Sequence, residues 1–182
     1  MGSATGAAVN SSSVEDAAAP PARRLEIWLP LLVIACDQAT KALIRARLPL
    51  YESVTVVTGL MDFTHVRNSG AAFGFLSGAD FPFKTVILAL VATTALVAVG
   101  LYAASLAHHQ LAARIGLALI TGGAAGNLLD RVVVGSVVDF VDVYWRSHHF
   151  WAFNIADSAI TVGVAIMIFD MLGMGTHVSK AV

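Results

Sequence analysis

The chain has 182 residues, of which 57% are hydrophobic and 13% are charged, and its formal net charge is −1. An ordinary soluble domain carries about 25% charged residues, so this composition disfavours a soluble globular protein and excludes a disordered one. There is no basic excess to neutralise phosphates, and the single cysteine excludes an internal disulfide framework. A small integral membrane protein that does not bind nucleic acid is therefore expected.

Residues 1–24 contain many Ala, Ser and Pro residues and no apolar run, which predicts a disordered N-terminal tail. A membrane-spanning helix needs about 20 mostly apolar residues. Four segments meet this requirement, and each is predicted to span the membrane: 25–44, 85–107, 111–129 and 153–172. Residues 25–174 are thus expected to form one four-helix transmembrane domain, and 175–182 a C-terminal tail.

Two segments between these helices are rich in β-branched residues and predict strands. Residues 50–66 contain Gly59 between two short runs, which is typical of two strands joined by a turn. Residues 132–144 predict one or two further strands. A small sheet outside the membrane is therefore expected.

Seven polar residues lie at the span ends that adjoin the two β-rich segments. Odd-numbered helices leave the bilayer by the face at which even-numbered helices enter, so these ends share one membrane face. A charged group in a span costs about 2.5–3.5 kcal/mol, which favours groups that are paired, hydrated or functional. The residues are Asp37 and Lys41 in the first helix, Asn127, Asp130 and Arg131 at the end of the third, and Asn154 and Asp157 at the start of the fourth.

Purely structural interpretations of these residues are also open. Asp37 and Lys41 are spaced to form an internal ion pair along one helix face. Asp130 and Arg131 are equally compatible with an ion pair at a helix end. The asparagine amides are compatible with hydrogen bonds that only join the helices.

The carboxylates suggest chemistry more strongly, because Asp139, Asp142 and Asp157 share this membrane face with few cations nearby in the sequence. Two neighbouring carboxyl groups in a low-dielectric site share one proton. Such a pair can activate water with one member and protonate a carbonyl with the other, as in an aspartic protease. On a strand Asp139 and Asp142 point to opposite faces. At most one of them therefore joins Asp157, and the spacing does not say which.

Five sequence blocks, in order and within the predicted spans, resemble lipoprotein signal peptidase (signal peptidase II), a family of bacterial intramembrane aspartic proteases. The resemblance extends from about residue 28 to residue 172. Each block alone is weakly specific, and the set is highly specific. The blocks are DQATK at 37–41, NSGAAF at 68–73, GGAAGNLLDR at 122–131, VDFVDV at 138–143 and FNIADS at 153–158.

The resemblance implies that Asp139 and Asp157 are the catalytic pair. No cysteine pair and no His-x-x-x-His spacing supports a metal site, and no cofactor is expected. Further residues match positions that bind substrate or brace the active site of the family. These are Asp37, Lys41, Asn68, Gly70, Asn127, Asp130, Arg131 and Asn154.

The family fold that the resemblance implies is an α-helical integral membrane protein. It has four transmembrane helices, a small extracytoplasmic β-cradle at about 50–66 and 132–144, and a short interfacial helix after Asn68. The implied location is the bacterial cytoplasmic (inner) membrane, with cytoplasmic termini and an active site near the outer face. We further expect a monomer in contact with membrane lipid, and a mobile lid at 67–78.

The implied function is to cleave the signal peptide from diacylglyceryl-modified prolipoproteins, just before the lipidated cysteine of the lipobox. Two other classes remain as alternatives. A small proton-coupled transporter could use the charged residues as a relay, but it predicts polar residues at both faces or an internal repeat, and neither is evident. A non-enzymatic membrane scaffold predicts that substitutions of the carboxylates are tolerated.

Overall fold

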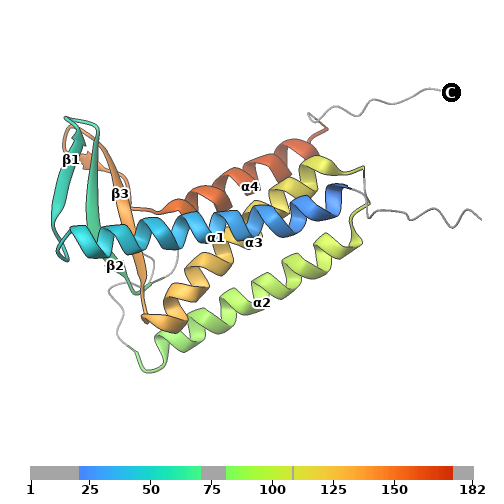
Figure 1. Cartoon of the computed structure of the whole chain (residues 1–182), viewed down its shortest axis with the longest axis horizontal. Helices are drawn as coiled ribbons and strands as arrows, with labels where there is room; N and C mark the ends of the chain where they lie inside the picture. The colour runs from blue at the N-terminus through green and yellow to red at the C-terminus, as the bar shows by residue number, and fades with distance from the viewer. Residues whose placement is uncertain (1–20, 71–80, 108, 174–182) are drawn as a thin grey trace, which may run out of the picture.

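The computed structural model describes residues 21–70, 81–107 and 109–173, which form a helical bundle with a small antiparallel sheet at one end (Figure 1). The helices are α1 (Pro21–Arg47), α2 (Lys84–Ser105), α3 (Leu111–Val133) and α4 (Ile155–Met171). The strands are β1 (Ser53–Val57), β2 (Met61–Asn68), β3 (Val137–Trp145) and β4 (His148–His149). They are hydrogen-bonded in the order β1-β2-β3-β4.

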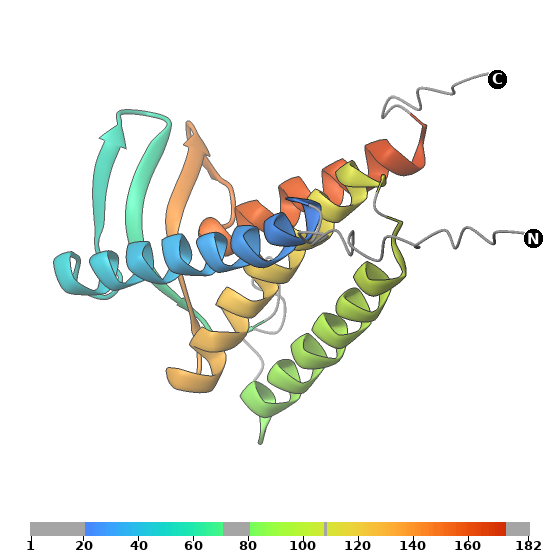
Figure 2. The same ribbon diagram turned by 45° about the vertical axis from the view of Figure 1, so that its right-hand side comes forward.

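Helix α3 is the centre of the bundle, because it packs against α1, α2 and α4. It also holds most of the buried helical residues, whereas α2 has none and lies at the side of the bundle (Figure 2). A helix that is apolar on all sides and unburied within its own chain is suited to contact with lipid. The mainly helical fold thus leaves one helix available to face the bilayer.

Three helices, α1, α2 and α3, are long and apolar enough to cross a membrane. Helix α4 has 17 residues, which span about 26 Å at 1.5 Å per residue, against a hydrocarbon core of about 30 Å. The prediction of a helical membrane protein with a small sheet is confirmed. Four spans stay a prediction.

The sheet lies at the end of the bundle where α1 and α3 end and α4 begins (Figure 1). The pairing of β2 with β3 shifts register between Phe63 and Val66. Beyond this bulge, Val66 lies opposite Asp139, and Asn68 lies opposite Val137. Residues two apart share a face of a strand, so Asn68 and Asp139 are diagonal neighbours on the same face of the sheet.

Some element boundaries differ from the predicted ones. Helix α1 extends beyond the predicted segment 25–44 at both ends, and α3 continues through residues that were predicted as strand. Gly135 explains the second difference, since it has a φ of +82° and its N–H donates to the carbonyl oxygens of Asp130 and Arg131. This arrangement ends helices, so β3 begins only after it. The predicted interfacial helix and most of the predicted lid fall on residues 71–80, outside the described residues.

Candidate active site

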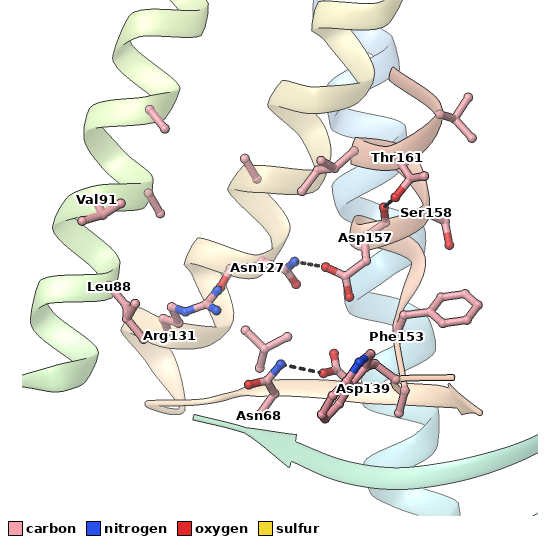
Figure 3. Close-up of a pocket in the computed structure, with 18 of the residues that line it drawn as sticks. Asn68, Leu88, Val91, Asn127, Arg131, Asp139, Phe153, Asp157, Ser158 and Thr161 are labelled. Carbon is pink, nitrogen blue, oxygen red and sulfur yellow. Dashed lines mark hydrogen bonds between the residues drawn. The ribbon is translucent and has the colours of Figure 1, made fainter. Parts of the chain in front are cut away.

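The carboxyl groups of Asp139 and Asp157 come from different elements and line the same cavity (Figure 3). Asp139 lies on β3. Asp157 lies in the first turn of α4, three residues after the N-cap residue Asn154. The fold thus brings together two acidic residues that the sequence analysis assigned to one membrane face. Asp142 does not join them, because its carboxylate pairs with His149, at 2.9 Å between Oδ2 and Nδ1.

The Asp139 carboxyl group is buried, with 3% of its surface exposed, and accepts one hydrogen bond at each oxygen. Asn68 Nδ2 donates to Oδ2 at 3.1 Å, across the diagonal from β2. Asn154 Nδ2 donates to Oδ1 at 2.7 Å. Two amide donors therefore fix the plane of this carboxyl group.

The Asp157 carboxyl group is held in a similar way. Asn127 Nδ2 donates to Oδ1 at 2.8 Å, and the backbone N–H of Asn154 donates to Oδ2 at 3.2 Å. In return, the N–H of Asp157 donates to Oδ1 of Asn154 at 2.9 Å. This reciprocal pattern is a capping box, which satisfies two N–H groups at the helix start. The same motif that begins α4 therefore orients Asp157 and links it to Asp139 through Asn154.

An ion cluster, buried except for Arg45, lies behind the two carboxyl groups. Lys41 Nζ is 2.8 Å from Oδ2 of Asp37 and 2.9 Å from Oδ2 of Asp130, and Arg45 Nη1 is 3.7 Å from Oδ1 of Asp130. A buried charge is tolerated when it is paired and hydrogen-bonded. The prediction that Asp37 pairs with Lys41 is confirmed, whereas Asp130 pairs with Lys41 rather than with its neighbour in the sequence.

The two acids of this cluster also hold the backbone next to the cavity. Asp37 Oδ1 accepts a hydrogen bond at 3.0 Å from the N–H of Ala156, the residue before Asp157. Asp130 Oδ2 accepts one at 3.3 Å from the N–H of Val138, the residue before Asp139. One ion cluster therefore anchors both segments that carry the cavity carboxyl groups.

Arg131 projects from α3 into the same cavity (Figure 3). Its Nη1 donates to the carbonyl oxygen of Asn127 at 3.1 Å, and its Nη2 donates to that of Gly70 at 2.8 Å. Arg131 thus connects the end of α3 to the chain that follows β2. Every residue that the sequence analysis assigned to the site contacts the cavity, the ion cluster or their hydrogen-bond partners.

The cavity has a volume of about 700 Å³ and is polar only near the carboxyl groups. Leu88 and Val91 of α2 and Ile160 of α4 line its apolar part. Aromatic residues after β4 line it as well, namely Phe150, Trp151 and Phe153. The site therefore combines a hydrogen-bonded acidic pair with an apolar wall that includes the unburied helix α2.

Burial raises the pKa of Asp139 from 3.8 to about 7, and the negative charge of Asp157 acts in the same direction. The amides of Asn68 and Asn154 and the charge of Lys41 oppose this change without cancelling it. Asp139 therefore gains and loses a proton near neutral pH. This behaviour is expected of one member of a carboxyl pair that shares a proton.

Some residues of the site were not predicted from the sequence. The contribution of α2 was missed because its apolar positions carry no chemical signal. The capping box was detectable, since Asn154 followed three residues later by Asp157 is a helix-start pattern. Within the described ranges, no group of three or more His, Cys, Asp or Glu residues is arranged to hold a metal ion.

Known proteins resemble this chain in both sequence and fold. The family profile described as Signal peptidase (SPase) II matches residues 29–173. The chain is 48% identical over 139 residues to the lipoprotein signal peptidase of Geobacter metallireducens. The aligned region covers 76% of this chain and 85% of that protein. The chain is also 48% identical over 139 residues to the lipoprotein signal peptidase of Geobacter sulfurreducens, covering 76% and 86%.

A similar solved structure is described as a bacterial membrane enzyme studied by the in meso method. The two share a TM-score of 0.75 and 31% sequence identity, over 87% of this chain and 94% of that one. The family predicted from the five sequence blocks is thus confirmed by the profile, the relatives and the fold. The chain belongs to the signal peptidase II family of membrane peptidases.

Proposed function

We propose that this protein is a membrane-embedded aspartic endopeptidase that removes signal peptides from prolipoproteins. Its substrates carry diacylglycerol on the lipobox cysteine, and the bond cleaved is the one just before that cysteine. The observation that carries this proposal is the pair of carboxyl groups, Asp139 and Asp157, in one cavity with an apolar wall.

The proposed mechanism uses one ionised and one protonated carboxyl group. The ionised member takes a proton from a water molecule as that water attacks the scissile carbonyl carbon, and the protonated member gives its proton to the carbonyl oxygen. The resulting tetrahedral diol collapses when the first carboxyl group returns a proton to the leaving nitrogen and a diol hydroxyl gives its proton to the second carboxylate. The C–N bond then breaks and the pair again holds one proton. The pKa of about 7 at Asp139 supports a single shared proton near neutral pH.

The apolar part of the cavity supports a lipid-modified substrate. Helix α2 has no buried residue, yet Leu88 and Val91 line the cavity. Acyl chains in contact with this wall would stay in the bilayer, so the enzyme would not need to extract them into water. The scissile bond would be held at the polar end of the cavity, beside the two carboxyl groups.

Further assignments belong to the same proposal. Helix α4 is the fourth span, the peptidase domain extends from the start of α1 at Pro21 to residue 174 between tails at 1–20 and 175–182, and the sheet is the extracytoplasmic β-cradle. The protein is a monomer without a cofactor in the bacterial inner membrane, with cytoplasmic termini and the site near the outer face. The residues proposed to bind substrate or brace the site are Asp37, Lys41, Asn68, Gly70, Asn127, Asp130, Arg131 and Asn154.

A paired-substrate assay tests this proposal. The purified full-length protein in mixed micelles is given a lipobox peptide with a diacylglyceryl cysteine, and separately the same peptide with an unmodified cysteine. Mass spectrometry is expected to find cleavage of the lipidated peptide alone, at the bond before the cysteine. Equal cleavage of both peptides would contradict the substrate class. No cleavage of either, with the folded protein present, would favour the transporter or scaffold alternatives.

A further inference from the structure

Three asparagine side chains donate to the carboxyl pair. Asn68 and Asn154 donate through Nδ2 to Asp139, and Asn127 donates through Nδ2 to Asp157. A side-chain amide can present either its NH₂ group or its oxygen to a neighbour. The NH₂ group favours an ionised carboxylate, whereas the oxygen requires a protonated one. The orientation of each amide therefore influences which protonation states the pair can adopt.

Each of these amides is oriented by a group at its oxygen that can only donate. The N–H of Gly70 donates to Asn68 Oδ1 at 2.9 Å. The N–H of Asp157 donates to Asn154 Oδ1 at 2.9 Å. For Asn127 the donor is a side chain, since Lys41 Nζ donates to Oδ1 at 3.0 Å. The first two donors belong to the backbone, whereas the Lys41 ammonium group can be removed by a substitution that leaves all three amides in place.

From this geometry we propose that Lys41 is a positioning residue for the carboxyl pair, whose ammonium group holds the Asn127 amide with its NH₂ group facing Asp157. The inference rests on the proposed peptidase function. Lys41 is fully buried, so substrate in the cavity does not touch it. It acts on the reaction through Asn127.

The Lys41 ammonium group is well suited to orient the Asn127 amide. It has three N–H donors and no acceptor, and its partners are Asp37 at 2.8 Å, Asp130 at 2.9 Å and Asn127 at 3.0 Å. The two acids fix the position of Nζ, and the third donor is directed at the amide. A neutral side chain at position 41 would leave Asn127 Oδ1 with one donor, the side-chain Nδ2 of Asn154 at 3.2 Å.

Without the ammonium group, the hydrogen bond from Asn154 Nδ2 alone opposes a turn of the Asn127 amide that places its oxygen towards Asp157. That arrangement is stable only when Asp157 carries a proton, so the pair loses its ionised member. The positive charge of Lys41 also lowers the pKa of Asp139. Both effects predict that loss of Lys41 moves the activity profile to higher pH. The charged groups around Asn127 and the pair are Asp37, Lys41 and Arg45 on α1, Asp130 and Arg131 on α3, Asp139 on β3 and Asp157 on α4.

The test compares Lys41→Met with the wild type in the lipidated-peptide assay. The value of kcat is expected to fall roughly 10- to 100-fold, the size of one lost hydrogen bond to a charged group. KM is expected to stay unchanged, because the residue does not reach the substrate. The pH profile of kcat is expected to move to higher pH. A merely structural role would reduce the amount of folded enzyme without moving the profile.

A double-mutant cycle separates action through Asn127 from a general loss of charge. In the Asn127→Ala background there is no amide to orient, so Lys41→Met is expected to change kcat less than twofold. Glu26→Gln with Arg114→Met is the matched control, since this ion pair also joins α1 to α3 at a distance from the cavity. It is expected to leave kcat and the pH profile unchanged.

Lys41→Met leaves Asp37 and Asp130 buried without their cation. A second variant therefore controls for a loss of activity that is caused by misfolding. Lys41→Met with Asp130→Asn removes one charge of each sign and is compared with Asp130→Asn alone. The proposal is overturned if Lys41→Met lowers kcat equally with and without Asn127, or if folded variants keep the wild-type kcat and pH profile. Failure of the wild type itself to cleave the peptide would instead reject the proposed function.

Discussion

Replacing Asp139 with asparagine is expected to stabilise the folded protein at high pH, although it removes one of the two proposed catalytic carboxyl groups. Burial and the nearby Asp157 raise the pKa of Asp139 from 3.8 to about 7. Each tenfold change in proton affinity corresponds to about 1.4 kcal/mol. An ionised Asp139 therefore costs the folded state up to about 4 kcal/mol relative to the unfolded chain.

The sign follows from the direction of the pKa change. A carboxyl group whose pKa is raised on folding binds its proton more tightly in the folded state, so stability falls as the pH rises from 3.8 towards 7. The full cost is present above pH 7 and only part of it at pH 5. Asparagine does not titrate, and its fixed cost from altered hydrogen bonds is the same at both pH values. The stabilisation by Asp139→Asn is therefore expected to be about 2–3 kcal/mol larger at pH 8 than at pH 5.

Equilibrium unfolding of the full chain in mixed micelles, with dodecyl sulfate as denaturant, measures this difference. The free energy of unfolding is determined for both proteins at pH 5 and pH 8. Asp142→Asn is the control on the same strand, because that carboxylate is 18% exposed and pairs with His149. It is expected to show a smaller pH-dependent change. Equal effects of Asp139→Asn at both pH values would refute the reasoning that burial destabilises the ionised form of this carboxyl group.

Other predictions concern the surroundings of the pair. Asn68→Ala removes a donor that lowers the pKa of Asp139, so the pH profile of kcat/KM is expected to move to higher pH; an unchanged profile would argue against this role. Gly126→Ala places a methyl group 2.8 Å from Asp37 Oδ2 and is expected to lower the unfolding free energy by about 1–3 kcal/mol, whereas Gly100→Ala, with open space around it, should not. Val91→Trp narrows the cavity and is expected to raise KM for the lipidated peptide roughly tenfold; an equal rise with Val97→Trp, on the same helix but outside the cavity lining, would contradict this.

Much of the architecture could be predicted because it depends on local composition. Long apolar runs identify the helices, and β-branched segments identify the strands. The alternation of span direction places the polar ends of α1, α3 and α4 together, since it needs only the order of the segments. Strand periodicity also separates Asp139 from Asp142, which bond to different partners in the structure.

The rest depends on tertiary geometry that spacing does not encode. Asp130 and Arg131 are adjacent in sequence, yet Asp130 pairs with Lys41 and Arg131 donates to backbone carbonyl oxygens. The end of α3 was placed too early because its last valines favour strands, while Gly135 is what ends the helix. The apolar wall from α2 was not predictable, because Val91 resembles any lipid-facing residue. Which polar side chains pair across helices depends on the packing of the whole bundle.

Asp139 and Asp157 are proposed to carry out the hydrolysis together. The most direct test is turnover of the lipidated lipobox peptide by purified Asp139→Asn and Asp157→Asn variants, with Asp142→Asn as the control and gel filtration to verify folding. Each of the first two variants is expected to be folded and to have no measurable turnover, while Asp142→Asn is expected to remain active. Substantial turnover by a folded Asp139→Asn or Asp157→Asn variant would contradict this proposal.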